Sequence, residues 1–222
     1  MPSVKIPRKS TATDMTPFVD VAFLILAFFM LATKFKPPSP IQVTTPRSVS
    51  SDKLKQQDAV VIEFDSSGRV FFTLQTEKLQ PDDLDRKRQV ISGVNKDRNL
   101  GLTGAQIDEF AKLPVTIGSP ANEVKGFFDV PIDRRGTYPL KGIPVDSTDN
   151  QLISWITNAK IAFAGRKLTY MIKGDNNAKY PSFKGVIEAM RKSDEYKYQL
   201  ITDPEGVPVG TAEYARRQIE KD

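Results

Sequence analysis

The chain has 222 residues, enough for one folded domain with appended segments, and it contains no cysteine and no histidine. These absences exclude disulfides, cysteine metal sites, the serine–histidine triad and the usual neutral-pH proton shuttle, so any proton chemistry falls to a carboxylate. The net charge of +5 comes from 32 basic and 27 acidic residues. Because the two signs are interspersed, the charge pattern indicates no nucleic-acid partner.

The N-terminal part combines a polar tail with the most apolar run of the chain. Residues 1–13 are basic, with two prolines and no apolar period. Residues 14–33 read DMTPFVDVAFLILAFFMLAT and are followed by Lys34 and Lys36. About twenty helical residues span roughly 30 Å, the thickness of a bilayer core, and lysines at the far end reach the interface. We therefore predict a cytoplasmic tail and a single transmembrane helix over residues 14–36.

An acidic residue, Asp20, lies inside this apolar run, about one helical turn after Pro17. An aspartate costs about 2.5–3.5 kcal/mol at the centre of an inserted helix and less near an end. Low dielectric favours the neutral form of a carboxylate, so such a group can carry a proton between apolar and aqueous surroundings. We predict that Asp20 is the proton-carrying residue and that Thr16, on the same helix face, supports it.

The start of the helix is marked by Pro17, whose missing N–H is no loss in a first turn. Asp14 and Thr16 can both cap that turn. For Asp14 capping is favoured over a part in proton transfer, whereas for Thr16 both roles remain open.

Three alternatives to this interpretation are a cleaved signal peptide, a buried helix of a soluble protein, and a plain membrane anchor in which Asp20 has no function. The first is disfavoured because Asp20 would lie in the apolar core of the signal and no small-x-small site follows near Ala32. Basic residues flank the run on both sides almost equally, so the short N-terminal tail and the large downstream part favour a cytoplasmic N-terminus.

The remainder of the chain divides into a linker, a domain and a tail. Residues 37–58 are rich in proline and serine and are expected to be an extended linker. Residues 59–208 are expected to form the folded domain, and residues 209–222 a polar tail. The expected elements are a hairpin over 59–74, helices over 81–95 and 104–113, a helix over 150–164, a strand over 168–174, a helix over 180–193 and a strand over 198–203.

This order predicts an α+β domain, a small mixed sheet with helices packed on it, behind one N-terminal transmembrane helix. Residues 80–150 are less regular and are expected to be an insertion that includes a passage rich in proline and glycine. Trp155 is expected in the core or in an interface. The sequences DSSG and DRRG are interpreted as turns, and Asp175 in KGD as a cap on the turn after its strand. We find no nucleotide-binding loop, and we predict no metal, no cofactor and no conventional enzyme.

Residues 14–33 closely resemble the membrane motif of the ExbD/TolR family. That motif reads Asn-x-Thr-Pro, two hydrophobic residues and Asp-Val, followed by an apolar run that ends near Phe-Met. The matching positions are Thr16, Pro17, Asp20, Val21, Phe29 and Met30. Asp14 replaces the commoner asparagine, which leaves a possible second titrating group at the membrane surface.

The resemblance continues into the domain, where residues 60–72 look like the family's first hairpin and residues 168–203 like its closing strand–helix–strand. The family domain is shorter, and residues 80–150 resemble the longer relatives from Bacteroidetes-like bacteria. The resemblance implies an inner-membrane homodimer inside a ring of multi-spanning subunits like ExbB, TolQ or MotA, with the domain in the periplasm. Protonation of Asp20 would drive movement that energises a TonB-like protein for outer-membrane transport. The alternative is a TolR-like module that binds peptidoglycan or protein in envelope maintenance.

Overall fold

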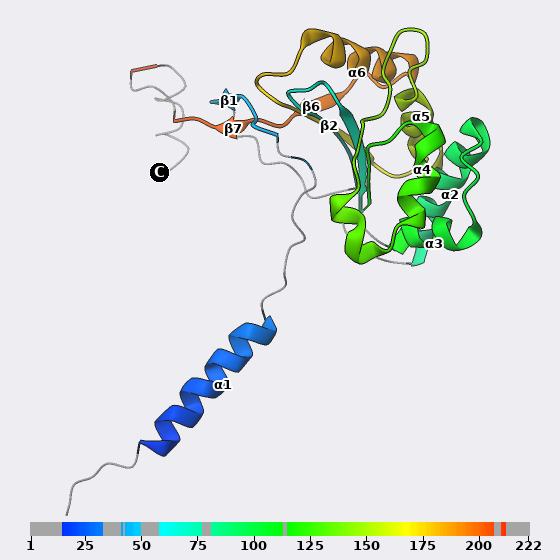
Figure 1. Ribbon diagram of the computed structural model, residues 1–222. Helices are drawn as coiled ribbons and strands as arrows, with labels where there is room; N and C mark the ends of the chain where they lie inside the picture. The colour runs from blue at the N-terminus through cyan, green and yellow to red at the C-terminus, as the bar shows by residue number, and fades with distance from the viewer. Residues whose placement is uncertain are drawn as a thin grey trace, which may run out of the picture. The chain divides into compact units, whose positions relative to one another are not determined.

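The computed structural model describes residues 15–32, 41, 43–49, 58–76, 81–112, 115–206 and 210–211. The chain forms two compact units, Met1–Ser39 and Pro40–Asp222. The described element of the first unit is helix α1 (Thr16–Ala32). All the other helices and strands belong to the second unit (Figure 1).

A five-stranded mixed sheet forms the framework of the second unit. Its strands lie in the order β4 (Thr116–Ile117), β3 (Val70–Gln75), β2 (Ala59–Phe64), β5 (Thr169–Gly174) and β6 (Tyr198–Leu200). Strand β2 pairs antiparallel with β3 and parallel with β5, β3 pairs antiparallel with β4, and β5 pairs parallel with β6. The mixed sheet with helices that the sequence predicts is therefore confirmed.

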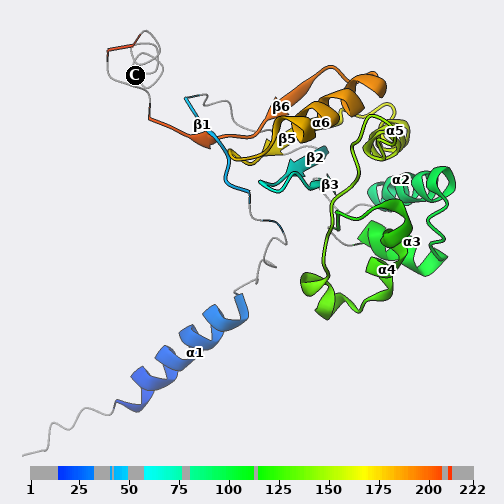
Figure 2. The ribbon, with the colours of Figure 1, turned by 45° about the horizontal axis from the view of Figure 1, so that its top comes forward.

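Helices form further layers beside the sheet. They are α2 (Pro81–Arg98), α3 (Gly104–Lys112), α4 (Ala121–Asp129), α5 (Leu152–Ala162) and α6 (Tyr180–Lys192), with a 3-10 helix, η1 (Ile132–Thr137). Helices α5 and α6 place their buried residues in the same core as the sheet, α2 packs against α5, and α3 packs against α2 (Figure 2). The predicted helices over 81–95, 104–113, 150–164 and 180–193 are confirmed.

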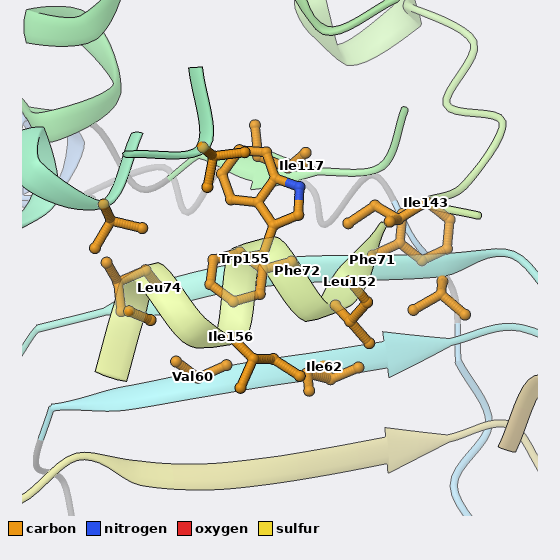
Figure 3. Packing of buried hydrophobic residues seen from close by; sticks show 14 of the residues in the cluster. Val60, Ile62, Phe71, Phe72, Leu74, Ile117, Ile143, Leu152, Trp155 and Ile156 are labelled. Atoms are coloured by element: carbon orange, nitrogen blue, oxygen red, sulfur yellow. The ribbon is translucent and has the colours of Figure 1, made fainter. Parts of the chain in front are cut away.

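The core lies between the sheet and α5. Leu152 and Ile156 on α5 point toward Val60 and Ile62 on β2 (Figure 3). Trp155, which is buried, packs its ring 5.3 Å from that of Phe72. These inward residues of β2 alternate along the strand, as a sheet with one helix-covered face requires. The prediction that Trp155 belongs to the core is confirmed.

The hairpin between β2 and β3 turns over residues 65–68, as predicted. The Gly68 N–H donates to the Asp65 carbonyl at 2.9 Å, and Gly68 has a φ of 83°, a conformation that glycine adopts without penalty. The Asp65 carboxylate accepts the backbone N–H of Arg69 at 2.9 Å and closes the turn. The sequence DSSG therefore forms a turn, as predicted.

Part of the expected linker is bound to the domain. Residues 43–49 contain strand β1 (Arg47–Ser48), which pairs parallel with strand β7 (Asp203–Pro204). Strand β1 is not expected from the sequence, because a two-residue strand carries no periodic pattern, whereas the predicted strand over 198–203 includes β6 and reaches the first residue of β7. Ile41 and Thr45 are buried, so this stretch contributes to the packing of the second unit.

Residues 115–140 differ most from the expectation. Helix α4 was not predicted, because it is short, contains Gly126 and buries only Val124, Phe127 and Phe128. The sequence DRRG, interpreted as a hairpin turn, instead lies in the 3-10 helix η1. There Arg135 donates hydrogen bonds to the last carbonyls of α4, including Phe128 at 3.0 Å, and pairs with Glu109 at 2.7 Å.

Candidate functional site

The predicted proton site lies at the start of α1. The helix begins at Thr16, and the Met15 carbonyl accepts the N–H groups of Phe18 and Val19, both at 3.1 Å. Pro17 occupies the first turn, where its missing N–H breaks no helical hydrogen bond. Asp14 lies outside the described residues.

Asp20 stands one turn further along α1. It lines a shallow depression in the helix surface together with Thr16, Pro17, Val19 and Phe23. Residues three and four apart share a helix face, so the Thr16 hydroxyl and the Asp20 carboxylate belong to one patch. Among residues 15–32, no side chain forms a hydrogen bond or an ion pair with the Asp20 carboxylate.

Apart from Thr16, the described side chains around Asp20 on α1 are apolar. The large side chains of the helix are more than half exposed, from Ile25 at 51% to Met30 at 75%. A helix that is hydrophobic all round requires an apolar environment, either other protein or lipid. The only carboxylate of the described helix thus sits in a surface that needs a cover.

Across the described residues, no helix combines the length and the apolar character that crossing a membrane requires.

Asp175, at the end of β5, has a structural role. Its carboxylate accepts the N–H of Asn177 at 2.8 Å and that of Thr44 at 2.9 Å. These two backbone donors hold the pKa of Asp175 below its usual value. The predicted cap is therefore confirmed, and it also binds the residues that precede β1.

A buried ionic cluster was not predicted from the sequence. Arg166, between α5 and β5, pairs with Asp58 at 2.8 Å and with Asp83 on α2. Burial lowers the pKa of the neighbouring Lys87, and the carboxylates of Asp83 and Asp58 oppose that shift. Two acidic and two basic groups balance in charge. The cluster joins α2 to the segments that lead into the interior strands β2 and β5. Among the described residues, no group of acidic side chains is arranged to hold a metal ion.

The described chain thus consists of an apolar N-terminal helix with one acidic residue and a separate α+β domain. The model of one protein family, described as biopolymer transport protein ExbD/TolR, matches residues 7–205. The chain therefore belongs to the ExbD/TolR family. No curated protein and no solved structure matches the chain.

The family match covers α1 and nearly all of the second unit, including residues 80–150. It confirms the resemblance that the motif around Asp20 indicates. Family membership supports a role in energising biopolymer transport and does not separate a TonB-type role from a TolR-type role.

Proposed function

We propose that the chain is the proton-coupled subunit of an inner-membrane motor and that Asp20 takes up and releases the protons that drive it. The observation that carries this proposal is the Asp20 carboxylate, one turn from Thr16, on an otherwise apolar helix of an ExbD/TolR family member. An ionisable residue in such a segment indicates a functional site.

The proposed membrane span is residues 14–36, of which the structure describes 15–32. Residues 1–13 would lie in the cytoplasm and the domain, residues 59–208, in the periplasm. The exposed apolar side chains of α1 support this arrangement, because lipid and a partner helix would cover them.

One helix cannot form a path for protons by itself. An unpaired carboxylate that faces lipid only costs free energy, so the other wall of the path must come from a protein that spans the membrane several times. The proposed partner is a ring subunit like ExbB, TolQ or MotA, and two copies of this chain would stand inside the ring.

The proposed cycle uses the two protonation states of Asp20. Against the apolar wall the carboxyl group would be protonated, and facing water it would be ionised. Each proton that crosses the membrane releases about 2.3 kcal/mol per 100 mV. Repeated uptake and release would move α1 relative to the ring, and the domain would transmit this movement to a TonB-like protein.

The test replaces Asp20 by asparagine, which keeps the shape of the side chain and removes its titration. In vesicles that contain the chain with its ring subunit, Asp20→Asn should reduce the proton flux to the level of empty vesicles, while both proteins still co-purify. Asp146→Asn, an exposed carboxylate of the domain, is the matched control and should leave the flux unchanged.

Full proton flux from the Asp20→Asn complex would contradict the proposal. The chain would then be better described as a tethered module that binds peptidoglycan or protein.

A further inference from the structure

The outer edge of the sheet continues beyond β6. Strand β6 is the last strand in its sheet, and no described strand pairs with its outer side. The extended backbone runs on into β7 (Figure 1), and its inward N–H groups alternate regularly. The N–H of Ile201 donates to the Ile172 carbonyl at 2.8 Å. The N–H groups of Asp203 and Glu205 donate to the carbonyls of Pro46 at 3.0 Å and Ser48 at 2.9 Å.

Backbone groups of successive strand residues point to opposite edges. Because residues 201, 203 and 205 bond inward, the N–H and C=O groups of Tyr198, Leu200 and Thr202 point outward. Pro204 is next in this row and has no N–H, which is compatible with a proline whose nitrogen faces away from its neighbouring strand. The row available for pairing therefore extends from Tyr198 to Thr202.

Between Lys197 and Pro204, the outward-facing row of this edge, Tyr198, Leu200 and Thr202, contains no charge and no proline. Soluble proteins place charges or prolines along a free edge to prevent pairing with another chain. Here the outward-facing row has Leu200 at its centre, 56% exposed, and Tyr198 beside it, 37% exposed. Tyr196, just before the strand, is 68% exposed.

We propose that this edge pairs with the same edge of a second copy of the chain, antiparallel and about a two-fold axis at Leu200. In this register Leu200 lies opposite Leu200 of the second copy, and Tyr198 lies opposite Thr202. Each of these pairs exchanges two backbone hydrogen bonds, so every outward donor from Tyr198 to Thr202 finds an acceptor. The two sheets then form one continuous sheet.

The charges along the strand agree with this register. Lys197 and Asp203 are equally distant from Leu200 and lie on the same face of the strand, so each lies opposite the other residue in the second copy. Both are exposed. Opposite charges that face each other across a strand pair stabilise it. Moving the axis to Thr202 would instead place Pro204, which lacks an N–H, opposite Leu200.

A five-residue strand pair is too small to hold two free proteins together. The inference therefore rests on the homodimer of the proposed function, in which two membrane-bound copies share one ring. Tethering raises the effective concentration of the second edge, and a small self-complementary contact is then sufficient.

The test uses cysteine cross-linking in full-length chain within membranes, because the native chain has no cysteine. Leu200→Cys should give a disulfide-linked dimer on mild oxidation, since Cα atoms of a directly opposed pair lie about 5.5 Å apart, within disulfide range. Tyr198→Cys alone should not cross-link, because position 198 of the second copy lies four residues, about 13 Å, along the strand from the position opposite. Tyr198→Cys combined with Thr202→Cys should cross-link again.

Ile132→Cys, an exposed apolar position on η1, is the matched control and should stay monomeric on the same gel. In the Leu200→Cys background, Lys197→Glu should lower the yield several-fold, and adding Asp203→Lys should restore it.

No dimer from Leu200→Cys, or equal cross-linking from Tyr198→Cys alone, would overturn this interface. A cross-link from Leu200→Cys only to a different protein would also overturn it and would assign the edge to an extended partner segment. Asp20→Asn should leave the Leu200→Cys dimer intact, so failure of the proton mechanism and failure of the interface give different results.

Discussion

Asp20 lies in the N-terminal part of α1 and Asp175 directly follows β5, and the surroundings of the two carboxylates differ. Asp175 accepts two backbone N–H groups, so its charge is used in the fold. Asp20 has only apolar neighbours and Thr16 on its helix. The Asp175 carboxylate therefore stabilises the fold, whereas the Asp20 carboxylate makes no such contact and is the group that we propose to carry the proton.

The first prediction at this scale concerns Asp175→Ala. The substitution removes both acceptors, so amide hydrogen exchange at Thr44 and Asn177 should become faster in the variant. Because the folded-state pKa of Asp175 is lowered, its stabilisation is present above the usual value of 3.8 and is lost as the pH falls through the lowered value. The difference in exchange rate between the variant and the native protein should therefore vanish at low pH. Asp146→Ala should show no such change, and a difference that persists at low pH would contradict the assignment.

At the scale of elements, α6 is held close to the loop that precedes α5. A methyl group on Gly185 would lie 2.5 Å from the carbonyl oxygen of Val145 and 2.8 Å from its Cγ2 atom. Asn150 donates to the Gly185 carbonyl at 2.8 Å from the same loop. Glycine is thus required by a close approach of backbone to backbone.

Gly185→Ala should destabilise the domain by about 1–3 kcal/mol, the usual cost of overpacking. The measurement is urea unfolding followed by the fluorescence of Trp155, the single tryptophan, which is buried in this domain. Gly104→Ala in α3 is the control, because its methyl group would meet nothing within 4 Å. An unchanged midpoint for Gly185→Ala would show that the loop moves away freely.

The elements that the sequence predicts are those with a local pattern. The hairpin around Gly68 and the helix around Trp155 have clear periods, and both form where expected. Strand β1 depends on residues more than 150 positions away, and no local pattern marks it. The cluster of Asp83 with Arg166 was missed for the same reason. In α1, by contrast, Thr16, Pro17 and Asp20 lie within the first two turns of one helix. Their spacing in the sequence is therefore sufficient to predict that they are close together.

At the scale of the whole molecule, the division into two compact units separates two possible roles of α1. If the helix is only a tether, any apolar helix can replace it. If it carries protons, the carboxylate at position 20 is indispensable. The domain should keep its stability in either case, because it forms a compact unit of its own.

The last prediction follows from this separation. A chain in which residues 14–33 are replaced by an unrelated neutral apolar helix of the same length should keep the urea midpoint of the domain, reported by Trp155. In vesicles with the ring subunit it should lose all proton flux, since no group remains in the helix to bind the proton. A second version of the same helix, with an aspartate returned at position 20 and Thr-Pro at 16–17, should recover part of the proton flux. Full proton flux from the neutral version would show that the helix is only a tether. The function of the protein would then reside in its domain.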